Sequence, residues 1–410
     1  MNTVAEVENK GREEMKFLGS LRYFAIGLLL IPLMTSPVIA EGFLLGEETK
    51  GVSISLAEHT NLTIRFILQP RLDFGDLTTS RGESRYESES DFYLRAVRLQ
   101  FEGSLIKNLT YAVHLSADKW QQRGHDDEVE LFYAFVDYKF LDEFSARAGK
   151  AKLPYSRISL TSIGKQLLLE RSVSTEAAKR VFDEYLQPYF LLHGRFLRGV
   201  LAYNLAVADG WEEGKTLRVG NTVHAAHPLF VGRIELSPPG WIEEKKSDAH
   251  LGMGRHLTLG VHYAIQDSIE YRENTFEEDR DLLGFDLSGH WKGITAQFEY
   301  NQWREDFTDP ARRSREPRGW YFQAGYFIKE IKGVAINLEP AARYEEYEQD
   351  SNVSDTKEKV WTLGANWYAK GHTLKIGANW AHTSFERAAA GRLARDNKKD
   401  VFQLQIQLYF

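Results

Sequence analysis

The sequence predicts a sixteen-stranded antiparallel transmembrane β-barrel, and three observations carry this prediction. Stretches of strand length alternate apolar and polar side chains from about residue 60 to the end of the chain. The connections between them alternate between short turns and long charged loops, which is typical of an up-and-down barrel. A segment that reads as a secretion signal precedes the first stretch. The mean hydropathy of −0.41 is too polar for a bundle of membrane helices.

Composition excludes several classes of function. The formal charge of −7 argues against a nucleic-acid partner, because such proteins normally carry a basic excess. The chain has no cysteine, which excludes a disulfide framework and a thiolate metal site. His224 and His227 lie three residues apart in an expected loop, and this spacing is weak support for a metal site. We therefore predict no nucleic acid, no cofactor and no metal site.

The N-terminal region predicts export. The segment LRYFAIGLLLIPLMTSPVIAEG (21–42) has a basic approach, an apolar run and small residues before a cleavage point after Ala40. Its apolar run, 25–33, is shorter than the ~20 residues that a membrane-spanning helix needs, which disfavours a membrane anchor. Residues 1–14 are acidic and unlike a signal, so Met15 is the expected start. We expect three parts: an N-terminal extension with the signal peptide (1–40), a short periplasmic segment (41–60) and the transmembrane β-barrel (61–410).

The predicted strands have two chemically distinct faces, because successive side chains of a strand point to opposite sides. In VWTLGANW (360–367) every second residue is apolar, and Trp361 and Trp367 close the apolar face at both ends, as interfacial aromatic residues do. The opposite faces carry Gln, Asn, His, Asp and Arg, which suit a water-filled interior better than the alternative, a soluble β-sandwich. The pairing within 184–256 stays open. We expect strand centres near residues 68, 97, 113, 133, 147, 188, 202, 233, 261, 286, 298, 324, 339, 364, 378 and 405.

The connections differ in length between the two ends of the predicted barrel. An even number of strands places both termini at one end, so we expect the long loops to be external and the termini periplasmic. The short turns fall at 103–108, 141–143, 292–293, 329–333 and 369–371. The long loops fall at 75–91, 119–127, 266–281, 304–318, 345–358 and 386–399.

The chain ends in a strand with one apolar and one polar face, VFQLQIQLYF (401–410). We expect its apolar side chains to face lipid and its glutamines to face the interior, and we expect it to close the sheet by pairing with the first strand, near 62–74. A final strand that ends in an aromatic residue resembles the recognition strand of bacterial outer-membrane barrels. The resemblance implies that Phe410 is an assembly signal and that the barrel assembly machinery is a partner.

Three further segments resemble one family, the phosphate-selective porins O and P. They are FYLRAVRLQFEGSL (92–105), FSARAGKAKLPYS (144–156) and LLLERSV (167–173). In the second, Gly149, Lys152, Pro154 and Tyr155 stand at the places of the family pattern. The resemblance implies a bacterial outer-membrane porin of sixteen strands, usually a homotrimer, whose third external loop folds into the pore. That loop would be roughly 152–183.

The expected third loop is basic, with six bases against three acids. Arg98 and Arg147 are expected on interior faces, whereas Arg95 has the opposite parity from Arg98 and needs a bulge or an interfacial position. Fixed cations in a narrow channel favour the passage of anions. The predicted function is diffusion of small hydrophilic solutes with a preference for anions, with phosphate and other oxyanions as candidates. The predicted pore residues are Arg98, Arg147, Lys152, Arg157, Lys165, Arg171, Lys179 and Arg180.

Two alternatives remain beside the porin. A barrel hydrolase needs a nucleophile next to a base, but His114 and Ser116 lie about 6.6 Å apart along one strand, and Ser288 and His290 do likewise. We therefore predict that the chain is not an enzyme. A non-conducting structural barrel, or a sheath around a periplasmic partner, is the other alternative. In every barrel interpretation the partners include outer-membrane lipid and lipopolysaccharide.

Overall fold

The computed structural model describes residues 50–78, 87–218, 221–243, 245–272, 277–309, 313–386 and 397–410. The expected extension, signal peptide, start and cleavage point lie outside these residues. Within the described part of the chain, no helix combines the length and the apolar character needed to cross a membrane.

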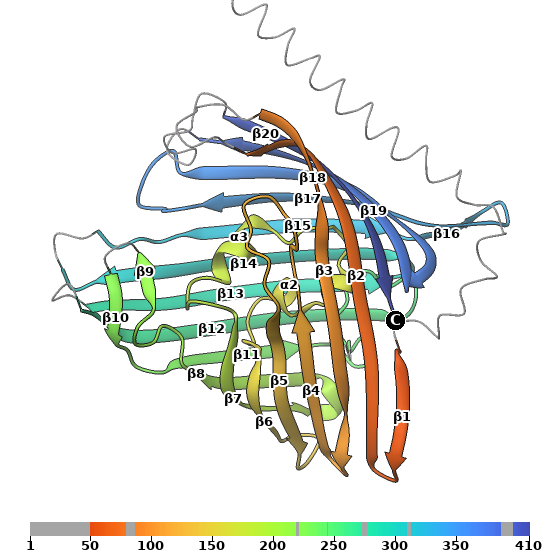
Figure 1. The fold of residues 1–410 in the computed structure, drawn as a ribbon, viewed down its shortest axis with the longest axis horizontal. Helices are drawn as coiled ribbons and strands as arrows, with labels where there is room; N and C mark the ends of the chain where they lie inside the picture. Colours follow the sequence, from red (N-terminus) through yellow and green to blue (C-terminus); the bar gives the residue numbers. More distant parts are fainter. Residues whose placement is uncertain are drawn as a thin grey trace, which may run out of the picture.

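Sixteen antiparallel strands close into a barrel (Figure 1). Each strand pairs with the next along the chain, and each of the sixteen expected centres lies inside one of them, so the predicted barrel is confirmed. The strands are β2 (Thr60–Thr78), β3 (Glu87–Ile106), β4 (Leu109–Ser116), β5 (Glu130–Lys139), β6 (Ser145–Lys152), β7 (Leu186–Phe196), β8 (Leu201–Ala208), β11 (Leu229–Leu236), β12 (Arg255–Tyr271), β13 (Glu277–Trp291), β14 (Ile294–Phe307), β15 (Arg318–Tyr326), β17 (Val334–Glu348), β18 (Lys357–His372), β19 (Leu374–Phe385) and β20 (Lys398–Tyr409).

Four short strands extend the barrel at its edges. β1 (Val52–Ala57) falls within the expected periplasmic segment and pairs with β2. β9 (Thr216–Arg218) and β10 (Asn221–Ala225) pair with each other between β8 and β11, and β10 also pairs with β12. β16 (Ile328–Ile331) follows β15 and pairs with β17.

The last strand closes the sheet against the first, as the sequence predicts. β20 pairs with β2 from Ile67 opposite Tyr409 to Gly75 opposite Val401. The backbone of Phe66 and Phe410 exchanges two further hydrogen bonds, of 2.8 and 3.1 Å. In hydrocarbon an unpaired edge would leave backbone groups without partners, so this seam is what allows the sheet to lie in a bilayer.

The distribution of side chains is the reverse of that in a soluble protein, with apolar side chains exposed and polar side chains buried. On β13, Phe285 is 41% exposed, whereas its neighbour Asp286 is 1% exposed. On β20, Gln405 and Gln407 are buried and Ile406 is exposed. The apolar faces therefore point outward and the polar faces inward, which confirms the predicted direction and excludes the β-sandwich.

The strands reach further into the predicted long loops than the sequence analysis expects. β12 continues to Tyr271 and β13 begins at Glu277, although 266–281 is expected to be a loop. The reason is that charged cross-strand pairs sustain the ladder beyond the apolar band. Arg304 bonds Asp281 at 2.8 Å, for example, and Arg318 bonds Glu348 at 2.7 Å.

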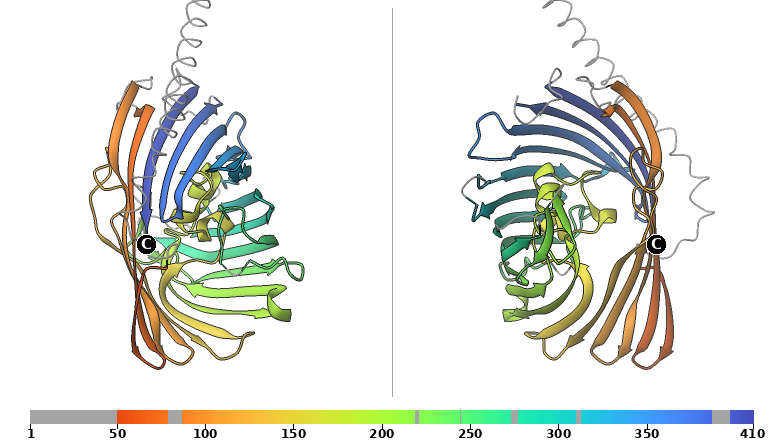
Figure 2. Two further views of the ribbon diagram at one scale, coloured as in Figure 1. Left: turned by 90° about the vertical axis from the view of Figure 1, so that its right-hand side faces the viewer. Right: turned by 60° about the vertical axis from the view of Figure 1, so that its left-hand side comes forward.

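The connection between β6 and β7, residues 153–185 (the β6–β7 segment), makes contacts across the barrel. It contains α2 (Arg157–Leu160), η2 (Ile163–Lys165) and α3 (Val173–Ala178), and Figure 2 shows the two α-helices between the curved walls. Its backbone carbonyls accept hydrogen bonds from buried side chains of five strands. The donors are Arg71 of β2, Arg343 of β17, Asn366 of β18, and Lys375 and Gln407 of β19 and β20.

Three consecutive leucines of this segment lie on three glycines of the wall. A Cβ at Gly325 of β15 would lie 2.8 Å from Leu167, and a Cβ at Gly364 of β18 would lie 2.6 Å from Leu168. A Cβ at Gly377 of β19 would lie 2.7 Å from Leu169. The glycines are therefore required because any larger side chain would occupy the space of a leucine.

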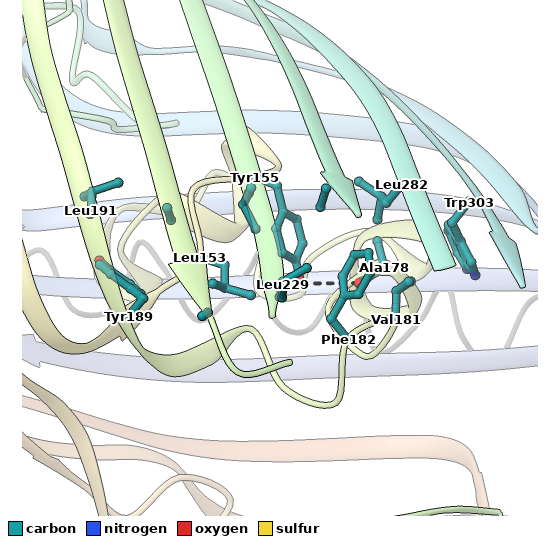
Figure 3. Close-up of a cluster of buried hydrophobic side chains, with 14 of the residues drawn as sticks. Leu153, Tyr155, Ala178, Val181, Phe182, Tyr189, Leu191, Leu229, Leu282 and Trp303 are labelled. Carbon is teal, nitrogen blue, oxygen red and sulfur yellow. Dashed lines mark hydrogen bonds between the residues drawn. The ribbon is translucent and has the colours of Figure 1, made fainter. Parts of the chain in front are cut away.

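An apolar cluster joins the same segment to the opposite wall (Figure 3). The Tyr155 hydroxyl donates to the Ala178 carbonyl at 3.3 Å and ties the two ends of the segment together. Each large apolar side chain buried in this way contributes on the order of 1.5–3 kcal/mol. The segment provides Leu153, Tyr155, Ala178, Val181 and Phe182, and strands β7 to β14 provide Tyr189, Leu191, Leu229, Leu282 and Trp303 among others.

A second connection, residues 237–254 (the β11–β12 segment), is long although it lies at the end of the barrel with short turns. The backbone N–H groups of Asp248 and Ala249 donate to the Lys165 carbonyl at 3.1 and 3.2 Å. His372 of β18 contacts the Ala249 carbonyl at 3.0 Å. The two segments therefore meet inside the barrel, in the region whose pairing the sequence leaves open.

Replacing Gly377 by leucine should destabilise the barrel by about 1–3 kcal/mol, because the new side chain overlaps Leu169. The measurement is the denaturant midpoint of the purified protein in detergent, followed by tryptophan fluorescence.

Gly232→Leu is the matched control. Gly232 lies on β11, and a Cβ there would meet only the Leu205 Cδ2 atom, at 3.6 Å. This substitution should change the free energy of unfolding by no more than about 0.5 kcal/mol. Equal midpoints for the two variants would contradict the leucine-on-glycine contact.

Candidate functional site

The candidate site is the inner surface around the β6–β7 segment and the cavity beside it. The cavity measures about 330 Å³ and lies between this segment and the inner faces of β2, β3 and β17–β20. Its charged lining has six acids and four bases. The charged lining residues are Asp73, Glu89, Asp91, Arg123, Glu170, Arg171, Arg343, Glu345, Glu358 and Lys399.

Glu170 is the central carboxylate of this surface. Its Oε1 atom contacts the Arg71 guanidinium directly and lies 3.3 Å from Arg95 Nε. Arg71 also donates to the Leu169 carbonyl at 3.0 Å and to the Gln405 side chain of β20. Burial alone would raise the pKa of Glu170, but Arg95 and Arg71 outweigh it and hold that pKa well below its usual range. The segment is thereby bound to the barrel wall through a charged pair.

Arg95 reaches the interior because of a β-bulge. Ala96 lies opposite Gln69 and Leu94 lies opposite Pro70, so Arg95 has no partner residue across the strand pair. The extra residue reverses the parity of the strand and leaves both Arg95 and Arg98 buried on the inner side. The sequence analysis required either a bulge or an interfacial position here, and the bulge is what the structure contains.

Arg98 and Arg147 lie in two separate networks. Arg98 donates to Asp118 at 3.0 Å and stacks over Phe132, with 4.0 Å between its guanidinium carbon and the ring centroid. Arg147 donates to Asp137 at 2.7 Å, and Asp137 also contacts His193. Arg98 therefore belongs with Arg95 near the segment, whereas Arg147 lies toward the short-turn end.

Lys152 and Arg171 hold the backbone of α2. The Lys152 ammonium donates to the Thr161 carbonyl at 3.2 Å. Arg171 donates to the Ile158 carbonyl at 3.1 Å, and its guanidinium lies 3.8 Å from Glu176. These two predicted pore residues are buried, and their polar atoms are turned toward the backbone of the segment.

The other four predicted bases divide between buried and exposed positions. Arg157 is buried and makes two bonds to Glu243, of 2.6 and 2.9 Å. Lys179 bonds Glu176 at 2.9 Å, and burial and Arg171 lower its pKa although Glu176 opposes them. The side chain of Lys165 is partly buried, and Arg180 is exposed.

Most of these charges form one group on the side of the segment that faces β2, β3 and β4. We call this group the basic cluster, and its members act on one another electrostatically. It holds eight bases against four acids. Its bases are Arg71, Arg95, Arg98, Lys119, Lys152, Arg171, Lys179 and Arg180, and its acids are Asp73, Asp118, Glu170 and Glu176.

Two arginines that hold the segment are absent from the sequence prediction. Arg71 shares an inner face with Gln69 and Asp73, so the alternation of β2 is a signal that would identify it. Arg343 donates to the carbonyls of Glu170 and Arg171 at 2.8 and 3.1 Å. A second missed group, Glu243, His250 and His256, comes together only through the fold of the β11–β12 segment and carries no short motif.

Comparison with known proteins extends these observations. The chain is similar to an uncharacterized protein of Aquifex aeolicus (strain VF5), with 34% identity over 400 residues that cover 90% of this chain and 92% of that one. Among solved structures, the anion-selective porin from Comamonas acidovorans superimposes with a TM-score of 0.59 at 13% identity, covering 86% of this chain and all of that one.

Two further solved structures share the fold. Salmonella typhi OmpF, solved with daunomycin, gives a TM-score of 0.58 at 12% identity over 88% of this chain and all of that one. The trimer form of Vibrio cholerae OmpT gives a TM-score of 0.52 at 9% identity, and the match covers 86% of this chain and all of that one. The family described as phosphate-selective porin O and P matches residues 64–190 and 289–410. The chain therefore belongs to the phosphate-selective porin O and P family and is an outer-membrane porin rather than an enzyme.

Proposed function

We propose that this porin passes small hydrophilic solutes by diffusion and favours anions, with phosphate and other oxyanions as candidates. The observation that carries the proposal is the basic cluster, which keeps eight bases against four acids on the inner surface. A positive surplus in a confined, low-dielectric passage raises the local concentration of anions. Exposed guanidinium groups can also bind two oxygens of a phosphate or carboxylate at once.

The β6–β7 segment is, in this proposal, the constricting third external loop. Its contacts with β2, β15, β18 and β19 support the role, because they hold its charged residues at fixed depth beside the cavity. The orientation follows: the long loops face the exterior and both termini face the periplasm. Lipid and lipopolysaccharide then surround the outer surface, and Phe410 serves the assembly machinery as the end of β20.

A homotrimer is part of the proposal. Two observations support it: the chain belongs to the phosphate-selective porin O and P family, and the structurally similar OmpT of Vibrio cholerae is described in a trimer form.

A second candidate function, a closed barrel that opens only on a signal or supports a periplasmic partner, has one specific observation in its favour. The β11–β12 segment meets the β6–β7 segment inside the barrel through Lys165, Asp248 and Ala249. The ion pair of Arg157 with Glu243 joins the same two segments. A barrel whose interior holds two long connections has a smaller open cross-section than a barrel that holds one.

The reversal potential of single channels in a tenfold KCl gradient tests the anion preference. We expect the sign that corresponds to a chloride permeability above that of potassium. Cation preference in the wild-type protein would contradict the proposal.

Arg180→Glu locates the selectivity within the basic cluster. Because Arg180 is exposed, the substitution leaves the buried pairs intact while changing the charge of the cluster by two. The ratio of chloride to potassium permeability should fall by about twofold to fivefold, as expected for two charges acting across an aqueous passage. Lys107→Glu, at the exposed turn between β3 and β4, carries the same charge change outside the cluster and should leave the ratio near wild type.

Arg157→Ala separates the two candidate functions. Losing this partner leaves Glu243 buried without its ion pair, which costs about 3–5 kcal/mol locally and should loosen the contact between the two segments. Open ohmic channels in the wild type support the porin. A silent wild type with conducting Arg157→Ala channels supports the closed barrel instead.

A further inference from the structure

A group of metal-ligating side chains lies at the short-turn end, apart from the basic cluster. We call Glu243, His250, His256 and His290 the histidine cluster. Glu243 and His250 come from the β11–β12 segment, and His256 and His290 lie directly opposite each other on β12 and β13. One ligand atom each of Glu243, His250 and His256 lies within 4.8 Å of the other two. The His250 ring is 4.6 Å from that of His256 and 4.5 Å from that of His290.

Four imidazole nitrogens of this cluster are buried without hydrogen-bond partners among the described residues. His256 is 2% exposed, and neither of its ring nitrogens has a partner. His290 is equally buried, and its Nε2 atom is unpartnered. His250 Nε2 faces Glu243 Oε1 at 3.6 Å, beyond hydrogen-bond distance. A buried nitrogen without a partner costs about 1–3 kcal/mol, and four such atoms at one place indicate a missing ligand.

Neighbouring groups orient the cluster as outer partners orient metal ligands. Arg157 and the Ser247 N–H hold the carboxylate of Glu243, at distances of 2.6 to 3.0 Å. Thr295 contacts His290 Nδ1 at 2.9 Å, and the Nε2 atom of the same ring has no partner among the described residues.

We propose that the histidine cluster binds one divalent transition-metal ion, Zn²⁺ foremost. Imidazole nitrogens with one carboxylate oxygen suit Zn²⁺, Ni²⁺ or Cu²⁺, whereas Mg²⁺ and Ca²⁺ prefer oxygen ligands alone. His250, His256 and Glu243 are the ligands, and His290 Nε2 takes the fourth position. Tetrahedral ligands at about 2.0–2.1 Å from zinc lie about 3.4 Å apart, so small side-chain rotations suffice to close the site.

The bound ion would join three parts of the barrel. It links the β11–β12 segment to β12 and β13, and through Arg157 it reaches α2 of the β6–β7 segment. A cavity of about 460 Å³ is lined by Leu251, Gly252 and Met253, which directly follow His250 in the chain. The site does not depend on which solutes the porin passes.

Metal titration of the folded protein tests the site. The full mature chain in detergent is treated with a chelator, dialysed and titrated with Zn²⁺, and Co²⁺ is used as a spectroscopic substitute. We expect one ion per chain and, with Co²⁺, the intense visible absorption of a tetrahedral site. His250→Ala and His256→Ala should each weaken binding at least about 100-fold, and Thr295→Val about 10-fold, because it only orients a ligand.

His227→Ala is the matched control. His227 is exposed at the opposite end, where it pairs with Asp267 at 2.8 Å, and its loss should leave Zn²⁺ binding unchanged. Circular dichroism checks that each variant forms a folded barrel. If His256→Ala does not fold, the Zn²⁺ affinity of His250→Ala tests the site instead, because His250 lies in a connection rather than in a strand. A folded wild type that binds no Zn²⁺ at 10 µM would overturn the proposal, as would equal losses for His250→Ala and His227→Ala.

Discussion

A backbone in hydrocarbon has to pair every N–H and C=O group within the protein, and this constraint governs the rest of the structure. The seam between β2 and β20 satisfies it by removing the last free edge. Once the sheet is closed, the alternation of side chains has only two outcomes, lipid or lumen. The apolar residues take the lipid side, so the interior has to be assembled from polar and charged side chains.

That polar interior explains how the two long connections are held. A segment inside a wet barrel gains less from apolar burial than a core helix does, so it is fixed by many specific contacts. Arg71, Arg343 and Gln407 donate to its carbonyls, and three glycines receive its leucines. Glu170, which Arg71 and Arg95 bind, also lines the cavity beside the segment. Under the proposed function, the same contacts would therefore serve both the structure and the selectivity.

The sequence predicts the parts of the structure that depend on local periodicity. Alternation identifies all sixteen strands, because it depends on side-chain parity alone. The outward direction of the apolar faces and the closing pair follow when the signal segment and the two classes of connection are added. Even the bulge at Arg95 is visible as a break in parity. The extent of strands beyond the apolar band is missed because charged ladders resemble loops in composition. The ion pairs and the histidine cluster are missed because their members are far apart in the chain, up to the 99 residues that separate Arg71 from Glu170.

The leucine-on-glycine contacts have a consequence for biosynthesis. Leu167, Leu168 and Leu169 precede the strands that receive them by well over a hundred residues, since the glycines belong to β15, β18 and β19. During export the segment has no surface to dock on until the C-terminal strands arrive. A chain that lacks those strands leaves three adjacent leucines exposed in the periplasm, where exposed apolar residues attract chaperones and proteases. The leucine-on-glycine contacts can therefore form only in a chain that already contains β15, β18 and β19.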